Sequence, residues 1–344
     1  MTAKATRAQT NVVYFLQTHN RPAQVARLVR VITEGSPDAT VIISHDEAGP
    51  ALDVAALRAL GNVHVMLDRG GYGDFSHLDR YFGAVDWLDA NGIGYDWLEN
   101  LTGQDYPLRP IGEIEDTLAA ADCDGFLQYS PVFPERVPPS ADQGTAGFTL
   151  VRAVDAKTRY DYRHWRLGKP TPAKKHLMRP LMALNLVQPW IRVFNSYASV
   201  GVRRRPVFGP GFYCYGGSFF CTLRAECARY VRDYARANPE MVNFFRGTAA
   251  PEEVFLHSVL VNSGQFNLNP DYKRYIDWTG CTHTHPRTLG TEDLPAMLAS
   301  GAHWARKLDL AKDPDLLDLL DQRIRRRPGR GTSTGSPGLR AFTA

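Results

Sequence analysis

Cysteine is scarce in this chain, and none of it is spaced for metal binding. Five cysteines occur in 344 residues. Cys221 and Cys227 lack the two-residue separation that zinc sites typically use. An odd number of cysteines without such spacing is typical of thiols that stay reduced. The cysteines therefore argue against zinc and indicate a cytoplasmic location.

Long hydrophobic runs and the common nucleotide-binding fingerprints are also absent. Residues 1–10 are polar, and no apolar run as long as a signal peptide or a membrane anchor follows them. Gly70, Gly71 and Gly73 do not form the GxGxxG pattern of dinucleotide-binding proteins, and no phosphate-loop pattern occurs. We therefore expect no anchoring helix, and the sequence disfavours a dehydrogenase.

The positive charge is concentrated in two segments. The formal net charge is +4, but six arginines follow the last acid, Asp321, and without them the charge is −2. This distribution argues against a dedicated nucleic-acid-binding protein. Residues 151–205 hold 13 lysines and arginines against two acids, with aromatic residues between them. Three interpretations stay open for this segment: a solvated face, a lid over an anionic donor, and a patch for a membrane or a polyanionic acceptor.

Strands and helices alternate along the N-terminal half. Apolar runs predict strands over residues 12–16, 41–44, 63–67, 95–101 and 125–130. Segments with a 3.6-residue period predict helices from Pro22 and over residues 51–60, 76–88 and 113–118. This alternation predicts a parallel, doubly wound sheet, in which ligands bind at the carboxyl ends of the strands.

Two carboxylates follow predicted strands at that edge. Asp105 comes after the strand over 95–101, on a turn that Pro107 and Pro110 keep from continuing as a strand. It can face a ligand or cap its own turn, and the geometry favours neither interpretation. Asp46 ends the second strand, as a ribose- or base-binding acid would, or as an exposed strand-end acid.

The turn around Asp105 carries a resemblance to a known family. Residues 102–109 read Thr-Gly-Gln-Asp-Tyr-Pro-Leu-Arg. This segment resembles the Ser-Gly-Gln-Asp-Tyr-Pro-Ile-Lys signature of the core-2/I-branching glycosyltransferases, β-1,6-N-acetylglucosaminyltransferases that are grouped with the peptide O-xylosyltransferases. Further similar segments follow in the order of the family between about residues 12 and 309: 72–76, 215–220, 251–253, 275–278, 285–289 and 305–309. Each is weak alone, and the set that is specific together consists of 104–109, 251–253, 275–278 with 285–289, and 305–309.

The resemblance implies an α/β, GT-A-like fold with a Rossmann-like mixed sheet flanked by helices. We expect one domain over residues 11–322, with a donor half over about 11–130 and an acceptor half over about 131–322 that carries the basic insertion 151–205. Residues 323–344 are expected to form a disordered basic tail. Animal members of the family have an N-terminal Golgi anchor, and we expect no such helix here. The chain is therefore expected to be a bacterial, cytoplasmic member.

The implied reaction is an inverting transfer of N-acetylglucosamine or xylose from a UDP-sugar to a hydroxyl of a glycan or another acceptor. The sequence has no clear Asp-x-Asp at the expected strand end. We therefore expect no metal cofactor, since two fixed cations can stabilise the leaving diphosphate instead. His283 and His285 have a spacing that suggests a metal, but no third ligand is near them in the sequence.

The resemblance assigns roles to single residues. The donor-binding residues are Thr18, Asp46, Asp105, Arg287 and Lys307, and the acceptor-binding residues are Glu113, Phe219 and Phe220. Each has an ordinary structural alternative: a surface cation, an acid that stabilises a helix N-terminus, or a ring in the core.

The catalytic base is implied to be Glu253. Glu252 and Glu253 follow Pro251 at the start of a predicted helix, about 100° apart around its axis. One acid can stay solvated while the other faces a cleft with a raised pKa, as a general base requires. The alternative is that both acids only stabilise the helix dipole.

Two rival functions remain. One is a non-catalytic α/β protein that binds a polyanion or a membrane surface. For the transferase itself, peripheral contact with the inner face of the membrane through residues 151–205 or the basic tail also stays open. The other is an α/β nucleotide-binding enzyme of another kind, which the missing fingerprints disfavour.

Overall fold

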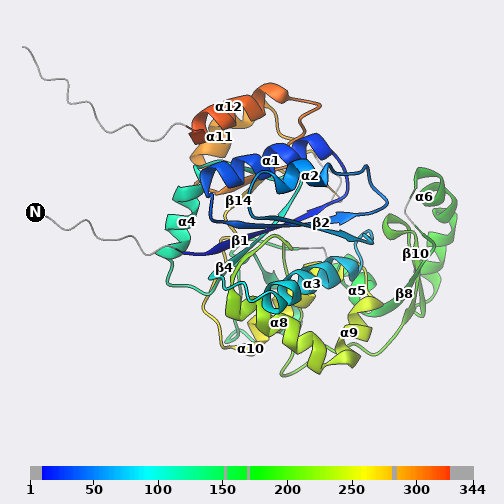
Figure 1. Ribbon diagram of the computed structural model, residues 1–344. Helices are drawn as coiled ribbons and strands as arrows, with labels where there is room; N and C mark the ends of the chain where they lie inside the picture. The colour runs from blue at the N-terminus through cyan, green and yellow to red at the C-terminus, as the bar shows by residue number, and fades with distance from the viewer. Residues whose placement is uncertain (1–9, 151–152, 169–170, 281–284, 326–344) are drawn as a thin grey trace, which may run out of the picture.

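The computed structural model describes residues 10–150, 153–168, 171–280 and 285–325 (Figure 1). A seven-stranded sheet lies at its centre, in the order β13-β6-β12-β4-β1-β2-β3. Strands β1 (Val12–Thr18), β2 (Thr40–Asp46), β3 (Val63–Asp68) and β4 (Trp97–Thr102) are parallel to their neighbours in this group. The parallel sheet predicted for the N-terminal half is confirmed.

The other half of the sheet makes it mixed. Strand β12 (Thr222–Arg224) runs antiparallel to β4 and to β6 (Gly125–Phe126), and β13 (Leu268–Asn269) is parallel to β6. The α/β class with a Rossmann-like mixed sheet flanked by helices is confirmed, and the arrangement is consistent with a GT-A-like fold.

Helices cover both faces of the sheet (Figure 1). One face carries α1 (Pro22–Gly35), α2 (Val54–Arg58), α4 (Ile111–Ala119), α11 (Leu294–Ala299) and α12 (Pro314–Arg325). The other carries α3 (Ser76–Ala90), α8 (Ala225–Ala237), α9 (Pro239–Arg246) and α10 (Phe255–Ser263). Strands β1 and β2 are buried along their whole length, which explains why they read as continuous apolar runs.

The α1 helix shows how the periodic pattern becomes packing. Val25, Leu28, Val29 and Ile32, the four residues that its pattern marks as buried, have no exposed surface. Fully burying side chains of this kind stabilises the fold by roughly 1.5–3 kcal/mol each. The predicted inner face of this helix is therefore confirmed.

Small sheets and 3₁₀ turns complete the body. Strands β14 (Arg274–Ile276), β15 (Trp304–Arg306) and β5 (Tyr106–Pro107) form one small sheet, and β7 (Ser130–Pro131) pairs with β11 (Tyr215–Gly216). The 3₁₀ turns of the body are η1 (Pro134–Arg136), η4 (Pro251–Glu253) and η5 (Thr291–Asp293). No helix in the described ranges has the length and apolar character needed to cross a membrane.

Residues 162–205 form a projection that we call the lobe (Figure 1). Its antiparallel sheet has the order β8 (Tyr162–Arg166), β10 (Ser199–Arg203), β9 (Ile191–Phe194). Its short helical segments are α6 (Pro172–Met178), η2 (Pro180–Ala183), α7 (Leu184–Val187) and η3 (Asn195–Tyr197). Helix α5 (Ala153–Tyr160) leads into it from the body.

Four element boundaries differ from the sequence-based predictions. Helix α2 is shorter than residues 51–60, and the strand expected over 125–130 is divided into β6 and β7, which belong to different sheets. Helix α12 continues to Arg325, so the first three residues of the expected tail are helical, and residues 326–344 lie outside the described ranges. Glu252 and Glu253 lie in η4, ahead of α10, rather than in the first turn of that helix.

Candidate active site

The carboxyl ends of β1 and β2 meet at one edge of the sheet, where Thr18 and Asp46 lie. The Thr18 hydroxyl is 2.8 Å from Nδ1 of His45, and Asp46 accepts a hydrogen bond from the amide of Ala48. Gly70 passes so close that a Cβ there would lie 2.7 Å from the Asp46 carboxylate. Both expected donor-binding residues are therefore at the predicted edge, in a tightly packed environment.

A buried arginine joins these strand ends. Arg80 of α3 donates to the Ser44 hydroxyl at 2.6 Å and to the Thr18 carbonyl at 3.2 Å. Burial lowers the pKa of Arg80, because its charge is taken from water. This cation was not identified in the sequence, where it lies on an amphipathic helix like any surface arginine.

Asp105 is fully buried and caps its own turn. One carboxylate oxygen, Oδ2, accepts from the Thr102 amide at 2.6 Å and from the Thr102 hydroxyl at 2.7 Å. The same oxygen lies 3.7 Å from Nη1 of Arg306, while Oδ1 has no hydrogen-bond partner. Asp105 thus caps its own turn, which is one of the two alternatives that the sequence left open. It also forms an ion pair with Arg306 at the sheet edge.

Two buried arginines beside Asp105 were missed in the sequence. Arg306 lies 3.7 Å over the ring of Phe220, and its Nε and Nη1 atoms are buried without a hydrogen-bond partner. Arg274 pairs with Glu99 at 2.7 Å, both side chains fully buried, and it too has two unsatisfied nitrogens. Buried donors are normally satisfied by protein, water or a ligand, so this edge is suited to an anion. The sequence signal was their position in two similar segments, Arg274 directly before residues 275–278 and Arg306 directly before Lys307.

The two cations expected to hold the diphosphate differ in their surroundings. Arg287 is held between Asp277 and Asp293, with Nη2 2.5 Å from each carboxylate. Lys307 follows Arg306, and its carbonyl accepts from the Leu289 amide at 2.8 Å. Both carboxylates thus already engage Arg287, whose side chain stays 34% exposed.

The carboxylate pair in η4 has two unlike members. Glu253 forms an ion pair with Arg159 of α5, at 2.8 Å. Burial, and then the charge of Glu253, raises the pKa of Glu252 to about 8, and its Oε2 atom is buried without a partner. The sequence predicted one acid with a raised pKa, and in the structure this acid is Glu252 rather than the expected base.

Aromatic and basic side chains surround this pair. The ring of Tyr197 lies 5.7 Å from the guanidinium groups of Arg159 and Arg166, and 5.9 Å from the ring of Tyr72. Arg166 donates to the carbonyls of Tyr72 and Gly73. Burial raises the pKa of both tyrosines, most strongly that of Tyr197. The lobe therefore contributes directly to the surroundings of the two glutamates.

The Tyr72 side chain connects the two parts of the site. Its ring is 6.3 Å from that of His285, and burial followed by the charge of Lys307 lowers the pKa of His285. The cluster around Glu252 is thus close to the segment that carries Lys307. Sequence reasoning had noted Tyr72 only as part of a similar motif, and Tyr197 gave no signal.

The three expected acceptor-binding residues are not brought together. Glu113 is exposed in the first turn of α4, and the buried residues of α4 pack on the α1 side of the sheet. The residues that follow η4 pack on the opposite side, so Glu113 and η4 belong to different faces. Phe219 is buried against Tyr81 and His77. Phe220 alone lies at the edge, against Arg306.

No group of three or more potential metal ligands occurs among the residues that the structure describes. His283, considered in the sequence as a metal ligand, lies outside them. The described cysteines Cys123, Cys214, Cys221 and Cys227 are buried free thiols.

The chain matches no protein-family profile. It is 23% identical over 296 residues to xylosyltransferase 1 of Mus musculus, which covers 79% of this chain and 25% of that protein. It is 24% identical over 309 residues to xylosyltransferase 1 of Canis lupus familiaris. That alignment covers 83% of this chain and 27% of the relative. The chain thus spans about a quarter of the length of the curated relatives it matches.

Two solved structures show distant similarity. A cytidylyltransferase from Leptospira borgpetersenii serovar Hardjo-bovis aligns with 35% of this chain and 54% of that chain, at 15% identity and a TM-score of 0.25. S. aureus TarS 1–349, solved in complex with UDP-GlcNAc, aligns with 42% of this chain and 41% of that chain, at 13% identity and a TM-score of 0.27.

Proposed function

We propose that this chain is a glycosyltransferase that moves N-acetylglucosamine or xylose from a UDP-sugar to an acceptor hydroxyl, with inversion and without a metal ion. Its similarity to two xylosyltransferases extends over about four-fifths of the chain and supports a sugar transferase. Within that frame, the observation that carries the proposal is the unequal pair Glu252 and Glu253, beside the edge at which the parallel strands end.

The unequal pair supports one choice of base. Burial, and then the charge of Glu253, raises the pKa of Glu252 to about 8, so Glu252 is mostly protonated at neutral pH. Glu253 is the acid in an ion pair, 2.8 Å from Arg159. We therefore assign Glu253 as the general base and Glu252 as a neutral neighbour that keeps the charge of the pair at one.

In the proposed reaction, Glu253 takes the proton of the acceptor hydroxyl as its oxygen attacks C1 of the sugar. The bond between C1 and the diphosphate oxygen breaks, and UDP leaves with the bonding electrons. Lys307 and Arg287 stabilise the charge that develops on the diphosphate, with Arg306 next to Lys307 in the chain. Such fixed cations can replace the Lewis acid that many transferases use.

The first experiment is thermal unfolding of the full chain with and without UDP. A ligand that binds only the folded state raises the melting temperature as its concentration exceeds Kd. A panel of UDP-sugars is then tested for hydrolysis and transfer, with UDP-N-acetylglucosamine and UDP-xylose first. Stabilisation by UDP and turnover of one donor support the proposal.

The alternative is a non-catalytic protein that binds polyanions or membranes. It is supported by the basic composition of residues 151–205 and predicts salt-sensitive binding without affinity for UDP. A chain that UDP does not stabilise, and that turns over no UDP-sugar, would refute the transferase and favour this alternative.

A further inference from the structure

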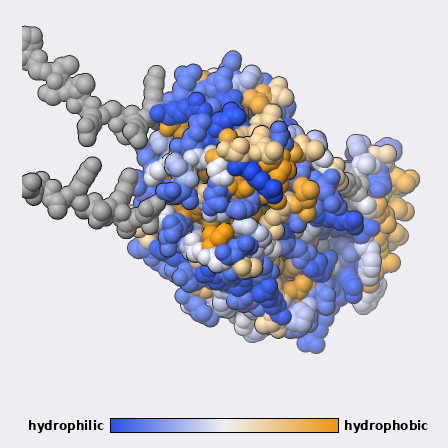
Figure 2. Space-filling model, in the orientation of Figure 1, coloured by the Kyte–Doolittle hydropathy of each residue, from blue (hydrophilic) through white to orange (hydrophobic). Residues whose placement is uncertain are grey.

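Exposed hydrophobic side chains are concentrated on the lobe. Thirteen large hydrophobic side chains are exposed in the described part of the chain, and ten of them lie within residues 165–202. The ten are Trp165, Leu167, Leu177, Leu181, Leu184, Leu186, Val187, Trp190, Ile191 and Val202. Figure 2 shows hydrophobic residues along the outer side of the lobe. Concentrated apolar surface of this kind marks a binding surface, whereas single exposed residues do not.

The strand pattern explains why this surface has no internal partner. In β8, Tyr162 and His164 are buried while Arg163 and Trp165 are exposed, so one face of the lobe sheet packs inward and the other faces outward. The outer face includes Val202 of β10, which is paired with Ile191 of β9.

Helix α6 and turn η2 cover only part of that outer face. Met178 and Met182 pack with Val193 and Val200. The α7 helix that follows presents Leu186 and Val187 outward, 88% and 77% exposed. No described residue covers them, so the apolar surface is left for a partner outside the chain.

The charge of the lobe identifies the chemistry of that partner. No aspartate or glutamate occurs from Tyr162 to Ala225, while residues 162–205 carry ten lysines and arginines. Within the described residues, Arg163, Arg179, Arg203 and Arg205 form no ion pair. Apolar side chains among unpaired cations are complementary to a bilayer of anionic lipids.

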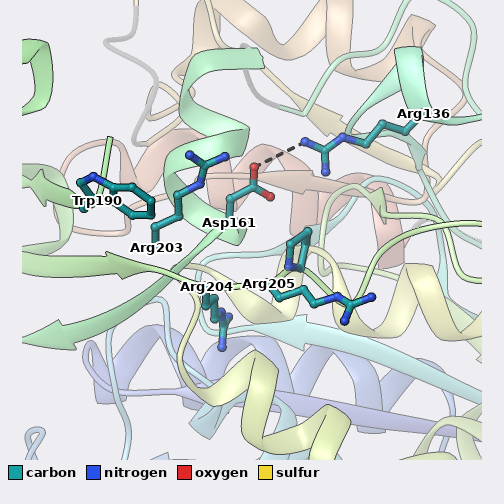
Figure 3. A pocket seen from close by; sticks show the side chains of 7 residues that line it. Arg136, Asp161, Trp190, Arg203, Arg204 and Arg205 are labelled. Carbon is teal, nitrogen blue, oxygen red and sulfur yellow. Dashed lines mark hydrogen bonds and ion pairs between the residues drawn. The ribbon is translucent and has the colours of Figure 1, made fainter. Parts of the chain in front are cut away.

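A basic pocket opens beside this surface (Figure 3). It has a volume of about 460 Å³, and its lining includes Arg136, Asp161, Trp190, Arg203, Arg204 and Arg205. Its one acid, Asp161, pairs with Arg136 at 3.4 Å. Arg204 stacks on Phe244 at 3.5 Å, and its buried Nε and Nη2 atoms have no hydrogen-bond partner. The exposed cations of the pocket are Arg203 and Arg205, which lie with the exposed ring of Trp190 in its lining.

We propose that the lobe docks on the surface of an anionic lipid bilayer. Leu186, Val187 and Trp190 enter the interfacial region, and the basic pocket receives lipid phosphate groups. A second copy of the chain is a poorer occupant, because it would bring two acid-free, positively charged surfaces together. The proposal rests on the lobe and the adjoining pocket and does not depend on the transferase activity.

The test is sedimentation of the full chain with vesicles of phosphatidylcholine, with and without phosphatidylglycerol. We expect binding to the anionic vesicles, weakened by salt. The Leu186→Ser/Val187→Ser variant should bind about tenfold or more weakly, because it removes two aliphatic side chains from the interface. Leu67→Ser is the matched control, since Leu67 is 64% exposed on β3 of the body.

Charge is tested in the same way. Arg203→Glu/Arg205→Glu should reduce binding to anionic vesicles by about tenfold or more, since each reversal near the surface removes a favourable cation and adds an unfavourable anion. Arg69→Glu is the control, because Arg69 is an exposed arginine of the body. Unchanged melting curves and unchanged stabilisation by UDP would show that these variants are folded and that only docking is affected.

Three results would overturn the proposal. The chain could fail to bind anionic vesicles, or it could bind them equally well with and without the lobe substitutions. Sedimentation velocity could also reveal a dimer that Leu186→Ser/Val187→Ser dissociates, without any binding to vesicles, which would assign the surface to a second copy of the chain.

Discussion

The raised pKa of Glu252 predicts a specific dependence of stability on pH. The folded chain holds a proton on Glu252 up to about pH 8, whereas an unfolded chain releases it near 4.5, the ordinary value. The folded state therefore binds more protons between these values, and its stability falls as the pH rises through this window. Replacing Glu252 with Gln removes the effect, because the amide does not titrate.

The size of the effect follows from the shift. Each pH unit costs the wild type at most about 1.4 kcal/mol relative to the variant, so the full window gives an upper limit of about 5 kcal/mol. Glu252 retains some exposed surface and interacts strongly with Glu253. We therefore expect about 2 kcal/mol above pH 8, equivalent to about 3 °C in Tm for a chain of this size.

The assay is thermal unfolding of both proteins from pH 4 to pH 9. The difference in Tm, variant minus wild type, should be lowest near pH 4.5 and should grow toward pH 8. Glu47→Gln is the control, since Glu47 pairs with an exposed arginine and such pairs contribute little. A difference that is constant with pH, or that shrinks as the pH rises, would refute a buried, protonated Glu252.

Further predictions concern catalysis. Glu253→Gln should lower kcat by about 10²–10⁴-fold with UDP affinity unchanged in calorimetry, whereas Glu252→Gln should keep most activity at pH 7; the opposite result would exchange the two roles. Activity should survive EDTA, and a loss that Mn²⁺ restores would contradict a metal-free mechanism. Lys307→Ala and Arg287→Ala should each weaken UDP binding by about one to two powers of ten, and unchanged affinity in both would remove them from the donor site.

Much of the fold could be predicted because its signals are local. The buried face of α1 and the apolar strands β1 and β2 are visible in the sequence as periodicity and continuous hydrophobic runs. The division of residues 125–130 into two strands was not visible. It depends on pairing with β12 and β11, which are about a hundred residues away in the chain.

The candidate site was predictable in its residues but not in their partners. The motif match directed attention to Glu253 and Asp105, and both lie near the expected edge. It could not show that Glu253 pairs with Arg159, because Arg159 lies 94 residues away in the basic segment. Nor could it show that η4 is a separate 3₁₀ turn, which places both glutamates before the first turn of α10.

The buried arginines at the sheet edge explain this limit in physical terms. A charged side chain is normally buried only with compensation, so Arg274 pairs with Glu99 and Arg306 lies beside Asp105. A guanidinium has five N–H donors and therefore needs several acceptors. Each of these arginines still has two buried nitrogens without a hydrogen-bond partner. An anion at the strand ends would supply the missing acceptors at a place where the protein already carries the desolvation cost of the cations. The significance of these two arginines therefore comes from their burial, a property that composition and spacing do not carry.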